Sequence, residues 1–148
     1  MSRKPNKQRA VNVVSPEVMA FERTMTVISI ALLVAAVCKA LFAILFDLSA
    51  ITNITGVMNL DRAVESGMGR ICLATSLVFF MGGVLGLSAR SRDASALRNA
   101  RLVALACIVC GVITIATGIW DGHNPCDIVF SLVGAGLSGA LYWYCRAR

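Results

Sequence analysis

Four apolar stretches, separated by short charged segments, constrain the fold of this 148-residue chain more than any other feature. They cover about residues 25–46, 70–89, 102–120 and 127–145. A hydrocarbon core about 30 Å thick is crossed by about 20 helical residues, and each stretch reaches or nearly reaches that length. With 57% hydrophobic residues overall, the pattern predicts a polytopic membrane protein.

The apolar stretches predict helices and not strands. They are continuously apolar, without the alternation of period two that barrel strands show, and only helices or closed barrels satisfy their backbone in lipid. The segments between them are too short to bury a core. We therefore expect an all-α membrane protein, a four-helix transmembrane bundle forming one domain over residues 25–145. A basic N-terminal segment, residues 1–24, precedes it, and residues 146–148 form a tail.

The first span is expected to begin as a helix before it enters the bilayer. Ser15-Pro16-Glu17 predicts a helix start from about residue 15, because Ser is a favoured N-cap and Pro is favoured at the first helical position. No cleavable signal peptide is visible, since the first apolar run exceeds the 7–15 residues of such a segment. The basic, acid-free first sixteen residues also leave a mitochondrial presequence open.

The Lys and Arg residues predict the orientation. Eleven of the fourteen lie in segments that four spans place on one side: Arg3, Lys4, Lys7, Arg9, Arg23, Arg90, Arg92, Arg98, Arg101, Arg146 and Arg148. The opposite side has only Arg62 and Arg70, against five acidic residues. Because Lys and Arg mark the cytoplasmic side, both termini are expected there, in the inner (plasma) membrane of a bacterium. The net charge of +6 then reflects topology and contact with anionic headgroups, and no nucleic acid partner is expected.

Small residues recur four apart, a spacing that lets helix backbones approach closely in lipid. The candidate packing faces are Gly82 with Gly86, Gly134 with Ser138, Gly136 with Ala140, Ala135 with Gly139, Ala31 with Ala35, and Ala36 with Ala40. One interpretation is packing inside the bundle. The other is a docking face for a partner or a second copy, which leaves a homo-oligomer or a larger membrane complex open.

Cys107-Ile108-Val109-Cys110 is the sharpest local motif, because one thiolate of a Cys-x-x-Cys pair can be resolved by the other. With four spans, it resembles the vitamin K epoxide reductase family, whose redox motif can read Cys-Ile-Val-Cys. The resemblance implies a thiol–disulfide oxidoreductase using Cys107 and Cys110. In that family the motif lies near a membrane surface and receives electrons from cysteines in the first outer loop; here it lies within the third span, and residues 47–69 contain no cysteine. Cys72 and Cys126 both fall near the outer face, so a disulfide between them is open.

Other chemistry has little support in the sequence. His123 is the only histidine, which excludes a bis-histidine haem site. No span centre holds Asp or Glu, unlike small multidrug exchangers, in which an intramembrane carboxylate carries the proton coupling. Phosphate loops, metal-ligand spacings and nucleophile elbows are absent, so we expect no cofactor, no metal and no enzyme activity.

Lys39 is the one charge well inside a span. A cation at that depth costs a few kcal/mol and is by default a functional-site hypothesis, although its stem could instead reach outward to the interface. Several other polar residues map to the same outer level: Asp47, Arg70, Asp121, His123 and Asp127. We predict that Lys39 points into the bundle within reach of a carboxylate from another element, and that any small-molecule or ion site opens here.

Spans two to four also resemble a group of small uncharacterised bacterial four-helix membrane proteins. The shared features are Arg70 at the start of the second span, the glycines of that span, and the Asp121-Gly122 turn after the third. This resemblance implies the architecture and no activity. The leading functional expectation is a non-catalytic accessory or scaffold module that packs against partner helices. The alternatives are an oligomeric small-solute transporter or channel with Lys39 on an internal polar path, and the thiol–disulfide oxidoreductase.

Overall fold

The computed structural model describes residues 15–49, 67–120 and 125–146 of the chain. Within these residues there are four α-helices, one 3-10 turn and no strand. The helices are α1 (Pro16–Ser49), α3 (Gly67–Ser88), α4 (Ala94–Trp120) and α5 (Pro125–Arg146), and the turn η1 (Ala89–Ser91) follows α3 directly. Each helix is long and apolar enough to cross a membrane, as the four predicted spans require.

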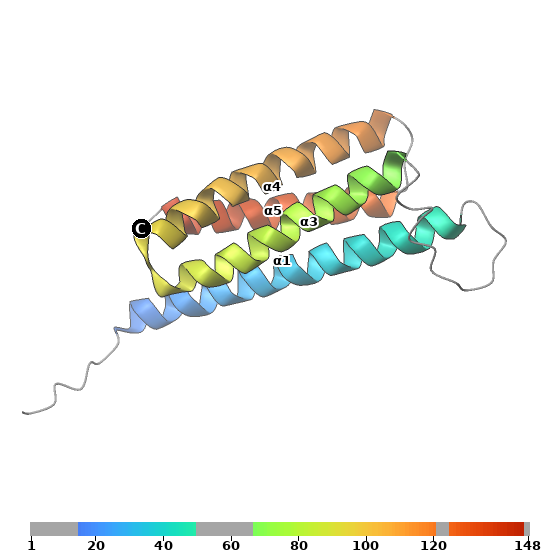
Figure 1. Cartoon of the computed structure of the whole chain (residues 1–148). Coiled ribbons are helices and arrows are strands. Elements are labelled where there is room, and N and C mark those ends of the chain that lie inside the picture. Colours follow the sequence, from blue (N-terminus) through green and yellow to red (C-terminus); the bar gives the residue numbers. More distant parts are fainter. Residues whose placement is uncertain (1–14, 50–66, 121–124, 147–148) are drawn as a thin grey trace, which may run out of the picture.

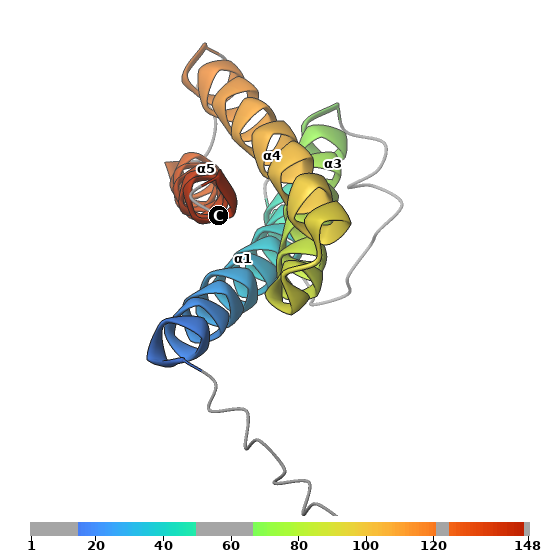
Figure 2. The ribbon, with the colours of Figure 1, turned by 90° about the vertical axis from the view of Figure 1, so that its left-hand side faces the viewer.

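The helices lie side by side as an antiparallel bundle (Figure 1). Helix α1 packs against α3 and α5, and α4 packs against the same two helices, so α1 and α4 occupy opposite corners (Figure 2). We call the end where α4 stops and α5 begins the acidic end, and the end where α4 begins and α5 stops the basic end. Helix α1 starts at the basic end, so residues 15 and 146 lie at the same end of the bundle.

The helix boundaries follow local signals in the sequence. Helix α1 begins at Pro16, and the Ser15 carbonyl accepts hydrogen bonds from the N–H groups of Val18 (2.9 Å) and Met19 (3.3 Å). Helix α1 then runs without interruption into the first apolar stretch, 34 residues in all. The turn between α3 and α4 closes at Arg92, which has a left-handed φ of 59°.

Helices α4 and α5 bury narrow stripes made mainly of small or polar side chains, whereas α1 also buries Phe21, Met25 and Leu32. On α4 the stripe is Ala100, Ala104, Cys107, Gly111, Thr114 and Gly118. On α5 it is Asp127, Ser131, Gly134, Ser138, Leu141 and Cys145. Exposed residues such as Val109, Val112 and Leu132 are each more than half exposed. The many large aliphatic residues that α4 and α5 leave on the outside distinguish this bundle from a water-soluble one, in which such residues are mostly inside.

Helices α1 and α3 pack closely because of three glycines on α3. A Cβ at Gly82 would meet Leu32 at 3.1 Å, and one at Gly83 would meet the Ser29 carbonyl at 3.0 Å. One at Gly86 would overlap the Ser29 hydroxyl. The predicted pair Gly82 and Gly86 therefore packs inside the bundle, where small residues let two backbones approach.

Candidate functional site: a buried ion pair at the acidic end

Lys39 is the largest fully buried side chain among the described residues and is 1% exposed. Its ammonium group donates to Asp127 Oδ1 at 2.5 Å and to Ser131 Oγ at 2.6 Å. Asp127 is itself 5% exposed. The prediction that Lys39 points into the bundle and pairs with a carboxylate from another element is confirmed.

The backbone helps to explain why Asp127 is the partner. Asp127 lies in the first turn of α5, where the positive end of the helix dipole favours a carboxylate. Ser131 lies one turn further along the same buried stripe, so both groups face α1. Asp127 uses one oxygen for Lys39, while its Oδ2 is buried without a hydrogen-bond partner among the described residues. The charges of Lys39 and Asp127 therefore nearly cancel, and Asp127 Oδ2 accepts no hydrogen bond from the described residues.

A second polar contact lies between α3 and α4. The hydroxyl oxygens of Thr75 and Thr114 are 3.0 Å apart, and each hydroxyl also contacts a carbonyl of its own helix, Ile71 at 2.7 Å and Cys110 at 2.8 Å. With Lys39, Asp127 and Ser131, these threonines bring buried polar side chains from all four helices into the half of the bundle nearer the acidic end. We call these five residues the polar layer.

Phe79 closes the bundle beneath the polar layer. Its ring is fully buried and lies so close to the α5 backbone that a Cβ at Gly134 would overlap it. A Cβ at Gly111 on α4 would be 3.5 Å from the same ring. The ring from α3 therefore lies against glycines of two other helices and occupies the space between them.

Most of the remaining side chains of the predicted outer-face cluster lie outside the part of the chain that the structure describes. Asp121 and His123 lie outside the described residues, and so does the side chain of Asp47. Arg70 is exposed on the first turns of α3. Within the predicted cluster, Lys39 and Asp127 form an ion pair with each other.

The Cys-x-x-Cys pair lies in the middle of α4. Cys107 is buried and its thiol lies 3.3 Å from the Val78 carbonyl on α3, whereas Cys110 is half-buried. Both are free thiols in the structure. Cys72 is buried and Cys126 is exposed, and no disulfide joins them.

The predicted packing faces divide between the inside and the outside of the bundle. Gly134 and Ser138 lie on the buried stripe of α5, where the Ser138 hydroxyl donates to the Gly134 carbonyl at 2.7 Å. Gly136 is exposed and Ala140 is half-buried, and a Cβ at Gly136 would meet nothing within 4 Å. The Gly136 face is therefore not used for packing within the described chain.

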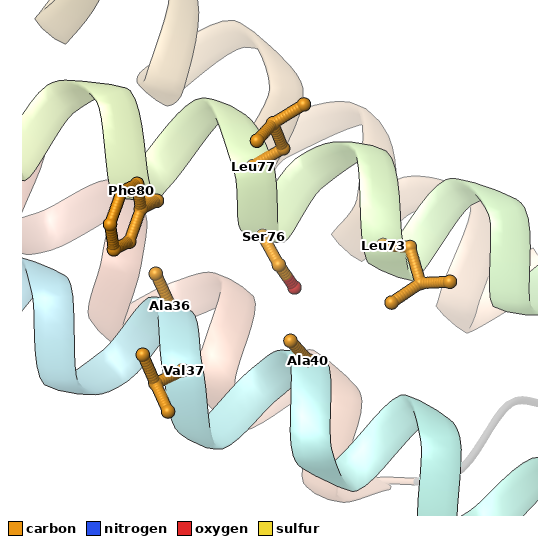
Figure 3. Close-up of a pocket in the computed structure, with 7 residues that line it drawn as sticks. All are labelled: Ala36, Val37, Ala40, Leu73, Ser76, Leu77 and Phe80. Atoms are coloured by element: carbon orange, nitrogen blue, oxygen red, sulfur yellow. The ribbon is translucent and has the colours of Figure 1, made fainter. Parts of the chain in front are cut away.

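An apolar groove runs along the outside of the bundle between α1 and α3 (Figure 3). Its volume is about 210 Å³, and it is lined by Ala36, Val37, Ala40, Leu73, Ser76, Leu77 and Phe80. The Ser76 hydroxyl is already used within α3, because it donates to the Cys72 carbonyl at 2.7 Å. The groove thus offers apolar contact and little capacity for hydrogen bonding.

Sequence reasoning missed Ser131, Thr75, Thr114 and Phe79 as parts of this region. A signal for Ser131 was available, since it follows Asp127 by four residues and so shares its helical face. The threonines and Phe79 have no such signal, because the spans are apolar on every side and do not indicate which face is buried.

The described residues contain no group of three or more His, Cys, Asp or Glu side chains that could hold a metal ion. No protein-family model matches the chain, and neither a curated protein nor a solved structure matches it.

Proposed function

We propose that the protein is an integral membrane protein whose four helices cross the bilayer with both termini on the cytoplasmic side. We further propose that it is a non-catalytic accessory or scaffold module that packs against partner helices. The basic end then faces the cytoplasm and the acidic end faces outward, as the Lys and Arg distribution favours.

The outward-facing aliphatic residues support membrane placement. Residues such as Leu77, Val112 and Ile119, each more than half exposed, would be costly in water. In lipid such a surface carries no such cost, and helices associate instead through small residues and interhelical hydrogen bonds. Both devices are present here, in the α3 glycines and in the Lys39–Asp127 pair.

One observation carries the non-catalytic proposal: the side chains of the polar layer mainly satisfy one another, and the other buried polar atoms without a partner among the described residues belong to Ser29 and Arg92. Lys39 is held by two partners, the two threonines meet each other, and Phe79 fills the space beneath them. Groups that bind or transform a substrate must present unused donors or acceptors to it. The donors and acceptors of the polar layer are used mainly for contacts between helices, as expected of a rigid module.

Two measurements test the proposal in turn. A C-terminal reporter that is active only in the cytoplasm should be active, and the chain should resist extraction by alkaline carbonate; periplasmic reporter activity would overturn the orientation. Purification in a mild detergent, followed by mass measurement, should then recover a stoichiometric partner protein. A pure homo-oligomer would contradict the accessory proposal.

The unpartnered Oδ2 of Asp127 favours a second candidate, an oligomeric transporter or channel with Lys39 on its polar path. Vesicles that contain the purified chain and a trapped pH dye would report proton flux under a potassium gradient. Flux that Lys39→Gln abolishes, and that Cys38→Ala leaves intact, would favour this candidate over the accessory module. Equal leak from protein-free vesicles would exclude proton conduction.

A further inference from the structure

Arginines gather at the basic end of the bundle, where α4 begins and α5 stops. Arg98 and Arg101 lie on α4, and Arg146 ends α5; all three are exposed. None of them forms an ion pair with a residue that the structure describes. Arginines without a carboxylate partner are free to receive an external anion.

The seam between α4 and α5 brings these three arginines together. The Arg101 guanidinium lies over the Tyr142 ring, 6.0 Å from its centroid, which sets the register of the two antiparallel helices. Arg98 precedes Arg101 by three residues, and Arg146 follows Tyr142 by four, so each lies on the same face of its helix one turn nearer the end. The backbone therefore places three guanidinium groups around one end of one seam.

Few carboxylates compete for these cations. Asp93, the acid nearest to them in sequence, precedes α4 and already accepts a hydrogen bond from the Ser95 hydroxyl. Glu17 and Glu22 lie on α1, which packs against α5, but neither forms an ion pair with a residue that the structure describes. The three arginines at the seam therefore have no ion-pair partner among the residues that the structure describes.

The depth of Arg101 matches the level of lipid phosphates under the membrane placement proposed above. Helix α4 has 27 residues, and about 20 of them cross the hydrocarbon; counted back from Trp120, these end at Arg101. Trp143 lies beside Tyr142 and is 68% exposed, which is typical of a residue at the hydrocarbon–headgroup boundary. A guanidinium at this level meets phosphate oxygens, with which it can form two parallel hydrogen bonds.

We propose that the α4–α5 seam at the basic end binds the headgroup phosphate of an anionic phospholipid, through Arg98, Arg101 and Arg146. Tyr142 positions Arg101 by stacking beneath its guanidinium. Basic pockets between helices on the cytoplasmic side are a recurrent form of anionic-lipid site.

The full chain, purified in a mild detergent, tests this by native mass spectrometry with phosphatidylglycerol and phosphatidylcholine of identical acyl chains. Phosphatidylglycerol should be retained preferentially. Arg98→Gln, Arg101→Gln and Arg146→Gln should each weaken its binding about fivefold, the effect of one basic residue near an anionic surface. Arg90→Gln in η1 is the matched control, since it removes an exposed arginine from the same end outside the seam, and should change binding less than about twofold.

Three outcomes would overturn the inference. Equal loss in Arg90→Gln would mean that only overall charge matters. Equal retention of both lipids would mean that no anionic preference exists, and displacement by inorganic phosphate at millimolar concentration would identify a phosphate site and not a lipid site.

Arg101→Lys keeps the charge without the planar donor, and should bind more weakly than the original chain and more tightly than Arg101→Gln. If Arg101→Gln lowers the melting temperature of the protein, lipid binding by Arg98→Gln and Arg146→Gln tests the inference, because both of these arginines are exposed.

The inference rests on the proposed membrane placement but can fail separately from it. A chain released by alkaline carbonate would refute the placement itself. A chain that stays in the membrane yet shows no preference for phosphatidylglycerol would refute only the lipid site.

Discussion

Replacing Lys39 with Met leaves the Asp127 carboxylate, 5% exposed, without a partner on either oxygen among the described residues, because Lys39 supplies its hydrogen bond in the structure. Removal of one partner from a buried pair costs about 3–5 kcal/mol, because an uncompensated charge remains in a low-dielectric site. Ser131 also loses a donor, which adds about 1 kcal/mol. We therefore expect Lys39→Met to lower the free energy of unfolding by about 4–6 kcal/mol, a large share of what a domain of this size has.

The double variant Lys39→Met with Asp127→Leu should be much more stable than Lys39→Met alone. It removes both charges and fills the site with apolar volume, an exchange that is often neutral in other buried pairs. Cys38→Ala provides the matched control, since Cys38 is the exposed neighbour of Lys39 on α1 and should change stability by less than about 0.5 kcal/mol.

Unfolding in mixed micelles, followed by far-UV circular dichroism as SDS is increased, measures these differences. The three variants and the original chain form a cycle from which the coupling between Lys39 and Asp127 follows directly. A cost of 0–1 kcal/mol for Lys39→Met, the range of an exposed ion pair, would refute the argument, because it would mean that water reaches the pair.

Three further predictions concern other parts of the bundle. Gly134→Ala should destabilise the fold by about 1–3 kcal/mol because its methyl group would overlap the Phe79 ring, whereas Gly136→Ala, which faces open space, should be neutral or stabilising by up to about 1 kcal/mol; the same SDS titration measures both, and equal effects would contradict the assigned packing. Thr75→Val and Thr114→Val should each cost about 0.6 kcal/mol, the average interhelical hydrogen bond in membranes, and the double variant should cost less than the sum, since the hydroxyl contact is shared; strict additivity would exclude the contact. In whole cells a membrane-impermeant maleimide should label the exposed Cys126 at the acidic end and spare the buried Cys107, as judged by a gel shift against Cys126→Ser; labelling that requires cell lysis would place the acidic end in the cytoplasm.

The number of helices was predictable from the apolar stretches, and the start of α1 from Ser15-Pro16, but α4 begins at Ala94, ahead of the apolar stretch predicted from about residue 102. The need for a partner to Lys39 was also predictable, since the cost of a lone buried cation does not depend on the details of packing. The choice of Asp127 was not, because it depends on how α1 and α5 are rotated and offset. In the apolar spans the buried and outward faces look alike in sequence.

Phe79 and Arg101 illustrate what lies beyond such reasoning. The Phe79 ring can lie against α5 only because residue 134, 55 positions later in the sequence, is a glycine and has no side chain. The stacking of Arg101 on Tyr142 requires the register of α4 against α5. Neither contact produces a recognisable pattern within one stretch of sequence, because each depends on how two helices are placed relative to each other.

The sequence separation of 88 positions between Lys39 and Asp127 has a consequence for synthesis of the protein. A chain that grows at about 5–20 residues per second produces Asp127 roughly 4–18 s after Lys39. Under the proposed placement, the first helix enters the membrane during that interval with a bare cation, at a cost of about 2.5–3.5 kcal/mol. Its other apolar residues must offset that cost alone. A chain truncated before α5 keeps this defect permanently, which marks it for retention at the insertion machinery or for proteolysis.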